Sequence, residues 1–339
     1  MVGFRGLGTL MLVGVLAGCS SSSDGSGGSG GAGGEGGAGS PLLDEYVLSD
    51  EELVPESGAF DPTSRAFFVG SQSKGIITRV AADGTESIFA TPPADQDWLS
   101  LGIAIDDSAR RLWACAQRAD EVTQEIWLFD LDSGDRVMSF PLADAAANST
   151  CNDIAVDGNG NAYVSDSENP RVYRADEGSE SVEVWADDAL LSPTGAGIFG
   201  GNGIAVSEDD RFVIVSKTSS GSPPRLLRIA LDDPSDVSEL VTTPALDGFA
   251  DGMSFLDGDL YIAMVGGGNV ARLRSDDDWA TAVIVLVPAD GGSTVPGTST
   301  VRPAEGRLYA VYSDITKALT GLTPVPPFRI YEVDLGAFE

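Results

Sequence analysis

One strand–turn–strand pattern occurs three times in this chain, and its copies are almost evenly spaced. Each copy begins with Asn or Asp, continues as a short apolar run, passes a turn, and enters a second apolar run. The copies begin at Asn152, Asn202 and Asp251, so the steps are 202 − 152 = 50 and 251 − 202 = 49 residues. A period of this size, built from strands and turns, is typical of the blades of a β-propeller.

Three weaker copies extend the repeat in both directions, and they begin at Ser57, Leu101 and Pro296. A third apolar run follows the first two in five of the units, at residues 76–80, 126–130, 171–174, 226–229 and 270–273. No stretch long enough for a helix carries an apolar stripe at helical spacing. The six copies therefore predict an all-β fold, a six-bladed β-propeller with four-stranded blades.

The N-terminal region differs from the repeats. Residues 1–18 join a basic start to an apolar run of signal-peptide length, too short to span a membrane. Leu16-Ala17-Gly18-Cys19 matches the lipobox of bacterial lipoproteins, so we expect a lipid on Cys19 that anchors an exported protein at the bacterial cell envelope. The alternative is a plain secretory signal that ends near a cysteine. Residues 19–40 form a Ser/Gly-rich linker, and residues 41–339 form the propeller.

Charge and the absence of histidine exclude several functions. The chain has 20 Lys and Arg against 52 Asp and Glu, a formal net charge of −32, and no His. Nucleic acids and acidic membrane surfaces need basic patches, so membrane contact is expected through the lipid anchor alone. Ser-His-Asp catalysis and His-ligated zinc or iron are excluded. Carboxylate and amide oxygens remain as metal ligands, which favours Ca²⁺ or another divalent cation such as Mg²⁺. We expect a monomer.

A metal centre is predicted where the innermost strands begin. Asn152, Asn202 and Asp251 open three such strands, so several blades direct an oxygen ligand at one axis. The alternative for each residue alone is a turn, since Asn and Asp before Gly are common turn formers.

The cysteines and tryptophans allow two further expectations. Cys115 and Cys151 either form a disulfide in an oxidising compartment or remain as two buried thiols. The tryptophans are expected to pack between blades; they are Trp98, Trp113, Trp127, Trp185 and Trp279.

Four segments together resemble a known family. The segments around Glu56, Asn152, Asn202 and Asp251 are similar in order and spacing to the metal-site segments of the gluconolactonase, regucalcin and luciferin-regenerating-enzyme family. Paraoxonases and diisopropyl fluorophosphatase are structural cousins of that family. The resemblance runs from Glu45 to the end of the chain, and it implies a six-bladed propeller with a divalent cation at the top of its central channel.

The resemblance also implies roles for the residues. Glu56, Asn202 and Asp251 would be direct ligands, and Asn152 a ligand or a substrate contact through a metal-bound water. Asp251 would help to activate water while the cation polarises a lactone or ester carbonyl. Asp153 would be an outer ligand or a carboxylate behind the ligands.

Two departures from the family leave two functions open. Thr150 stands where sugar-lactone members often carry an arginine, and the histidines of the paraoxonase-like cousins have no counterpart. The first function is an envelope-anchored, cation-dependent hydrolase that acts on a small lactone or ester. The alternative is a non-catalytic propeller with a structural calcium ion that binds a partner. Substrate choice would lie in the loops at 192–201 and 288–298.

Overall fold

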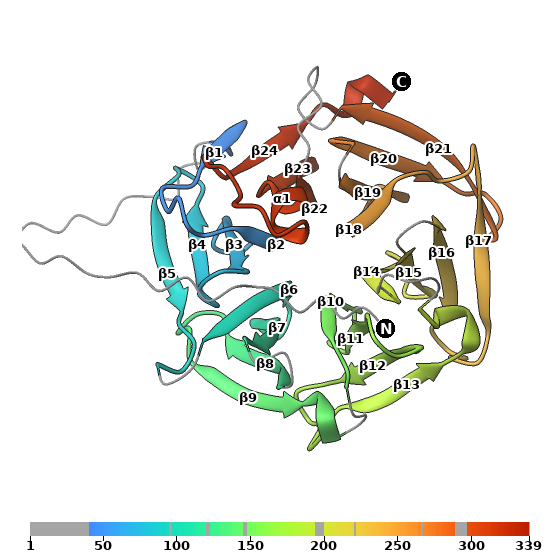
Figure 1. Ribbon diagram of the computed structural model, residues 1–339, viewed down its shortest axis with the longest axis horizontal. Coiled ribbons are helices and arrows are strands. Elements are labelled where there is room, and N and C mark those ends of the chain that lie inside the picture. Colours follow the sequence, from blue (N-terminus) through green and yellow to red (C-terminus); the bar gives the residue numbers. More distant parts are fainter. Residues whose placement is uncertain are drawn as a thin grey trace, which may run out of the picture. The chain divides into compact units, whose positions relative to one another are not determined.

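Six four-stranded blades surround a common axis, and the first strand of each blade lies next to that axis (Figure 1). The computed structural model describes residues 41–94, 97–119, 123–144, 148–193, 200–219, 222–265, 267–288 and 297–338. The predicted all-β, six-bladed propeller is confirmed. The lipidation of Cys19 and the linker lie outside the described residues and stay predictions.

Each blade runs outward from its innermost strand to a strand at the rim of the ring. From the axis outward, blade 1 comprises β2 Pro55–Asp61, β3 Ala66–Ser71, β4 Ile77–Ala81 and β5 Glu86–Ala90. Blade 2 comprises β6 Trp98–Asp106, β7 Arg111–Arg118, β8 Gln124–Asp130 and β9 Arg136–Pro141. Blade 3 comprises β10 Cys151–Val156, β11 Ala162–Asp166, β12 Arg171–Ala175 and β13 Glu183–Asp187. Blade 4 comprises β14 Gly201–Val206, β15 Phe212–Ser219, β16 Ser222–Ala230 and β17 Val237–Thr243. Blade 5 comprises β18 Phe249–Leu256, β19 Asp259–Val265, β20 Asn269–Arg274 and β21 Thr281–Pro288. Blade 6 comprises β22 Thr298–Ala304, β23 Arg307–Tyr312, β24 Arg329–Val333 and β1 Glu45–Val47.

Burial explains why these segments form strands. The second strands β3, β11 and β19 are buried at every position, because both of their faces pack against neighbouring blades. Their sequences are accordingly almost continuous apolar runs. The outer strand β5 is partly exposed at most positions, and its sequence is mixed. Six apolar clusters fill the six spaces between neighbouring blades, and every tryptophan belongs to one of them, as predicted.

The ring is closed by a strand from the start of the propeller. β1 pairs with β24, and Glu45, Tyr46 and Val47 lie opposite residues 329–331. The N-terminal strand is thus the outermost strand of the last blade (Figure 1). Blades 4 and 5 are joined in another way, since their outer strands β17 and β21 pair in parallel.

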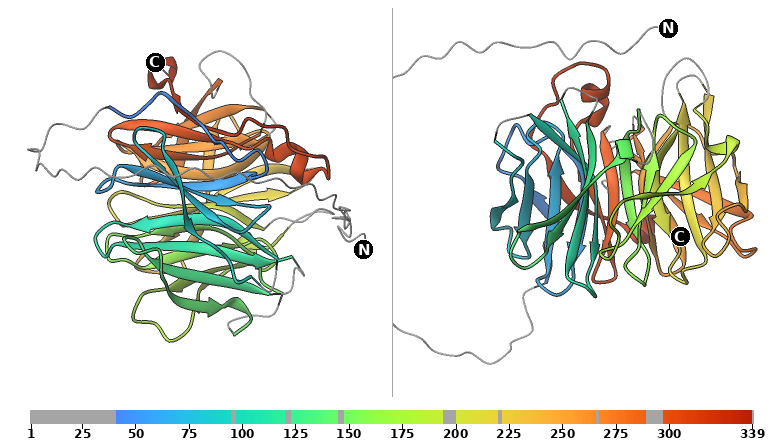
Figure 2. Two further views of the ribbon diagram at one scale, coloured as in Figure 1. Left: turned by 90° about the vertical axis from the view of Figure 1, so that its left-hand side faces the viewer. Right: turned by 90° about the horizontal axis from the view of Figure 1, so that it is seen from below.

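Short helices lie in the connections, namely η1 Leu142–Asp144, η2 Ala189–Leu191 and α1 Ile315–Leu319, and η3 Leu335–Phe338 follows β24. No helix within the described ranges has the length and apolar character that a membrane span requires. The strands run between the two ends of the ring (Figure 2). We call the end at which the inner strands begin the site end.

The disulfide is present. Cys115 in β7 and Cys151 at the start of β10 are bonded, with their Cα atoms 5.4 Å apart. The bond joins blade 2 to the inner strand that carries Asn152.

Candidate metal centre

Every inner strand contains a β-bulge near its beginning, where the register of its pairing with the second strand shifts. The residues that open the six bulges are, in blade order, Glu56, Leu101, Asn152, Asn202, Asp251 and Ser299. A bulge inserts one residue and redirects a side chain. The four predicted ligands thus occupy equivalent positions in blades 1, 3, 4 and 5. All four lie in strands, so the turn interpretation is wrong for them.

Close approach between neighbouring inner strands explains the glycines that follow Asn202 and Asp251. A Cβ on Gly203 would lie 2.1 Å from the carbonyl oxygen of Asp251, and one on Gly252 would lie 2.2 Å from Thr300 Oγ1. Neither position can hold a larger residue without moving the next blade. The Asn-Gly and Asp-Gly pairs therefore combine a ligand with a site of close strand packing.

Asn202 and Asp251 contact each other directly. Asn202 Nδ2 donates to Asp251 Oδ1 at 3.1 Å and to the Ala250 carbonyl oxygen at 2.9 Å. The two side chains belong to residues that are only 3% and 6% exposed. Because Nδ2 has used both hydrogens, Oδ1 is the atom with which Asn202 could bind a cation.

The other two predicted ligands present buried oxygens. Glu56 Oε2 and Asn152 Oδ1 are both buried, and neither has a hydrogen-bond partner within the described part of the chain. Burial of a polar atom without a partner costs free energy, so such atoms are uncommon in native proteins. A cation between these oxygens would remove that cost.

The carboxylates near the axis affect one another. Burial raises the pKa of Glu56 well above its ordinary value, and the charges of Asp251 and Asp153 add to the effect. Burial, followed by the charge of Asp153, raises the pKa of Asp251 to about 8, although the Asn202 hydrogen bond opposes this. Burial also raises the pKa of Asp153, against the opposing charge of Arg302. The charge on one of these buried carboxyl groups therefore disfavours ionisation of its neighbours.

Asp153 is held by donors from its surroundings. Its Oδ1 accepts from the Ile154 amide at 2.9 Å, and its Oδ2 accepts from the Ile204 amide at 3.4 Å. Arg302 Nη2 lies 3.5 Å from Oδ1. Because its oxygens are occupied in this way, Asp153 fits the role of a carboxylate behind the ligands.

Arg302 is the component of the centre that the sequence prediction missed. It lies in β22, and its side chain is 11% exposed. Its guanidinium donates to the Gly58 carbonyl oxygen, to Ser57 Oγ at 3.2 Å and to the Met253 carbonyl oxygen at 2.9 Å. A signal was present: counted from the bulge, this arginine takes the position occupied in the other inner strands by Ala59, Ala104, Ala155, Ala205 and Ser254.

The charges in the centre fit a divalent cation. The carboxylates Glu56, Asp153 and Asp251 carry three negative charges when ionised, and Arg302 carries one positive charge. The sum, −3 + 1 = −2, would be neutralised by one Ca²⁺ or Mg²⁺. Across the described residues, three or more Asp, Glu or Cys side chains do not come together in an arrangement that could hold a metal ion. A cation here would thus need the amide oxygens of Asn152 and Asn202 beside the carboxylates.

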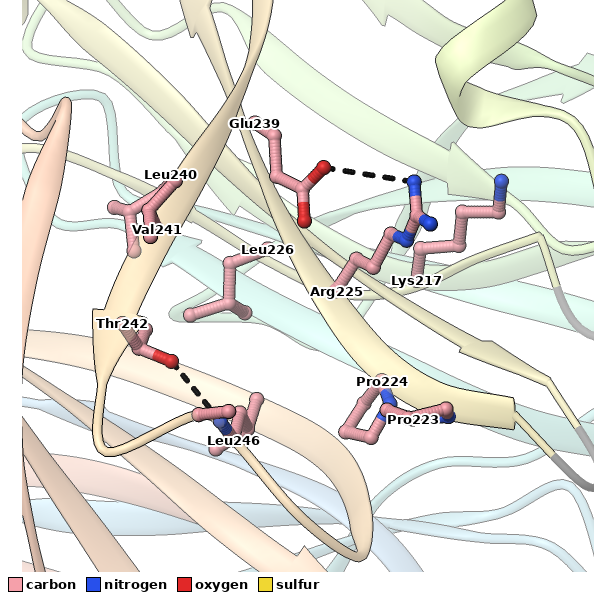
Figure 3. A pocket seen from close by; sticks show the side chains of 11 residues that line it. Lys217, Pro223, Pro224, Arg225, Leu226, Glu239, Leu240, Val241, Thr242 and Leu246 are labelled. Atoms are coloured by element: carbon pink, nitrogen blue, oxygen red, sulfur yellow. Dashed lines mark hydrogen bonds and ion pairs between the residues drawn. The ribbon is translucent and has the colours of Figure 1, made fainter.

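A cavity of about 500 Å³ lies farther from the axis, at the ends of β15, β16 and β17 (Figure 3). It is at the site end, because Lys217 pairs with Gly201 at the start of β14. Lys217 Nζ donates to the Leu190 carbonyl oxygen at 2.8 Å, and Arg225 lies 3.5 Å from Glu239. None of the predicted ligands lines this cavity. The loops expected to choose a substrate fall largely at 194–199 and 289–296, outside the described residues.

Known proteins share this fold. The profile of the SMP-30/gluconolactonase/LRE-like region matches residues 54–295. The major allergen Mala s 1 of Malassezia sympodialis is 18% identical, with a TM-score of 0.69 over 86% of this chain and 96% of the allergen. A Xanthomonas campestris gluconolactonase is 18% identical, with a TM-score of 0.59 and coverages of 85% and 89%. The calcium-binding protein regucalcin of Agrobacterium tumefaciens is 17% identical, with a TM-score of 0.57 and coverages of 87% and 94%. No curated protein matches the chain.

Proposed function

This chain belongs to the SMP-30/gluconolactonase/LRE-like family, and we propose that it is a divalent-cation-dependent hydrolase of lactones or related esters. One observation carries the proposal. Glu56, Asn152, Asn202 and Asp251 open equivalent bulges around the axis, and within the described residues Glu56 Oε2 and Asn152 Oδ1 are buried there without a hydrogen-bond partner. A structure that served folding alone would gain by replacing these groups with apolar ones.

The side chains divide the work of the reaction. Glu56, Asn152, Asn202 and Asp251 would hold Ca²⁺ or Mg²⁺, which when bound supplies polarisation of the carbonyl and acidification of water. Asp251 is the general base, since its carboxylate can take a proton from the attacking water. Asn202 orients that carboxylate through its 3.1 Å hydrogen bond. Burial of the centre keeps its electrostatic interactions strong.

The experiment is hydrolysis of a panel of small lactones and esters, with and without chelator. We expect turnover in calcium and loss of turnover in chelator. Asp251→Asn keeps an oxygen at the same place but removes the base, so the rate should fall by a factor on the order of 10² or more. Asp106→Asn is a matched control, because Asp106 lies at the other end of an inner strand. Full activity of Asp251→Asn would place the chemistry elsewhere.

A second function, a binding propeller with a structural cation, is favoured by Thr150. This residue stands where sugar-lactone relatives often have an arginine, and its amide donates to Asp166 Oδ1 at 3.0 Å. Stabilisation by calcium without turnover of any substrate in the panel would favour this function.

We also propose that Cys19 anchors the protein at the bacterial envelope, on the lipobox that precedes it.

A further inference from the structure

Arg302 connects the strands of three predicted ligands at the level just beyond each ligand. It donates to Ser57 and Gly58, which follow Glu56, and to Met253, which lies two residues after Asp251. Its Nη1 also donates to Ser254 Oγ at 3.0 Å. These contacts cross from blade 6 to blades 1 and 5.

An ion pair connects Arg302 to a third blade. Arg302 Nη2 lies 3.5 Å from Asp153 Oδ1, and Asp153 directly follows the predicted ligand Asn152. The guanidinium therefore also reaches blade 3. Small residues at the equivalent position of the other blades leave room for one long side chain, and two arginines could not be placed there without repulsion.

The fixed positive charge of Arg302 determines how much positive charge of a bound cation the centre can neutralise. Arginine stays protonated in proteins, so its charge does not vary with pH. The buried position limits screening by salt. The three nearby carboxylates are thereby reduced to an effective charge of −2, which matches one divalent ion.

We propose that Arg302 is a selectivity-determining residue, whose buried positive charge makes the metal centre prefer divalent over trivalent cations. The inference rests on the proposed cation site. It goes beyond that proposal because it assigns the choice of cation charge to a residue that is not itself a ligand.

The test compares two probes of similar size and different charge, Ca²⁺ and Tb³⁺. Their affinities are measured by calorimetric titration of the metal-free protein, and their ratio is compared between variants. A ratio cancels general losses of stability, which weaken binding of both ions alike. The extra charge on Tb³⁺ is repelled by Arg302, and two unit charges within about 10 Å at an effective dielectric constant of about 20 interact strongly enough to change a binding constant about tenfold.

Arg302→Met should therefore raise the preference for Tb³⁺ over Ca²⁺ by about tenfold or more. Arg302→Lys keeps the charge and should keep the wild-type ratio. Arg110→Met is a matched control, since Arg110 also bridges carboxylates but does so through Asp61 and Asp132 at the other end of the ring.

Two further variants test charge apart from shape. Asp153→Asn should move the ratio in the opposite direction, because it leaves the centre with one negative charge fewer. The double variant Arg302→Met with Asp153→Asn restores the sum of −2 and should return the ratio toward the wild-type value. These variants also decide the matter if Arg302→Met alone does not fold.

The outcomes separate this inference from the proposed function. If wild type binds neither ion, the metal centre is refuted and the inference with it. If wild type binds calcium but Arg302→Met and Asp153→Asn leave the ratio of Tb³⁺ to Ca²⁺ affinity unchanged, the metal centre stands. Arg302 then only holds neighbouring inner strands together and does not select the cation.

Discussion

Removal of divalent cations should make the stability of this protein depend on pH, and Asp251→Asn should abolish much of that dependence. The pKa of Asp251 is about 8 in the folded protein and 3.8 for an ordinary aspartate. A raised pKa means that the folded protein keeps a proton which the unfolded chain releases. The stability associated with this proton is complete below about pH 4 and is lost as the pH rises toward 8.

The magnitude follows from the two pKa values. At pH 7 the unfolded aspartate lies about 3 pH units above its pKa of 3.8, and each unit corresponds to about 1.4 kcal/mol. The metal-free wild type should therefore lose on the order of 4 kcal/mol between pH 4 and pH 7 through this residue. Glu56 acts in the same direction, because burial and neighbouring charges also raise its pKa. Several kcal/mol correspond to a fall in Tm on the order of 10 °C for a chain of this size.

The assay is denaturant unfolding from pH 4 to pH 8 in chelator and in saturating calcium. In chelator, Asp251→Asn should be the more stable protein at pH 8, although it has lost a native side chain. In calcium the order should reverse, because the ion pairs with the charged carboxylates of wild type, and the pH dependence of wild type should largely disappear. Equal pH dependence of the two proteins in chelator would refute the account of a crowded, uncompensated group of carboxylates.

The remaining predictions concern other parts of the chain. Calcium at a hundredfold excess over Kd should stabilise wild type by about 2.7 kcal/mol; Asn202→Ala should weaken this binding, so that more calcium restores the Tm, and a Tm indifferent to calcium in wild type would contradict the metal centre. The Cys115–Cys151 bond closes a separation of 36 residues, so its reduction should lower the free energy of unfolding by about 4 kcal/mol. An unchanged unfolding midpoint in reductant would contradict a stabilising role of this disulfide. A fatty-acid analogue should label the intact protein and not Cys19→Ser, and equal labelling of the two would disprove the lipid anchor.

The sequence predicted the inner and second strands best, because two features mark them together: an apolar run and a regular spacing along the chain. Inner and second strands were recognisable because an apolar run follows a polar residue at a regular interval, and Asn152, Asn202 and Asp251 lie where that interval places them. The outermost strands could not be assigned in this way, because the residues of a strand such as β5 are exposed or half-buried at most positions and lack the repeated sequence pattern.

Contacts between distant parts of the chain were also beyond the sequence pattern. β1 joins the last blade through pairs such as Tyr46 with Ile330, and no local signal relates the two. Arg302 was missed because its role depends on Asp153 and Ser57, which are 149 and 245 residues away. A charged residue in an otherwise small-residue position of the repeat was the one available hint.

The closing strand has a mechanical consequence. Residues 42–44 lead into β1, the strand that seals the ring, and β1 is held to β24 by three residue pairs and by backbone hydrogen bonds at either end, from Leu48 to Phe328 and from Glu332 to Asp44. Any pull transmitted along that segment, as on a protein tethered in flowing liquid, reaches this seam before it reaches the inner strands. Under load the ring would open at blade 6 first. Asn202 and Asp251, on blades whose outer strands are joined to each other, would be the last part of the centre to separate.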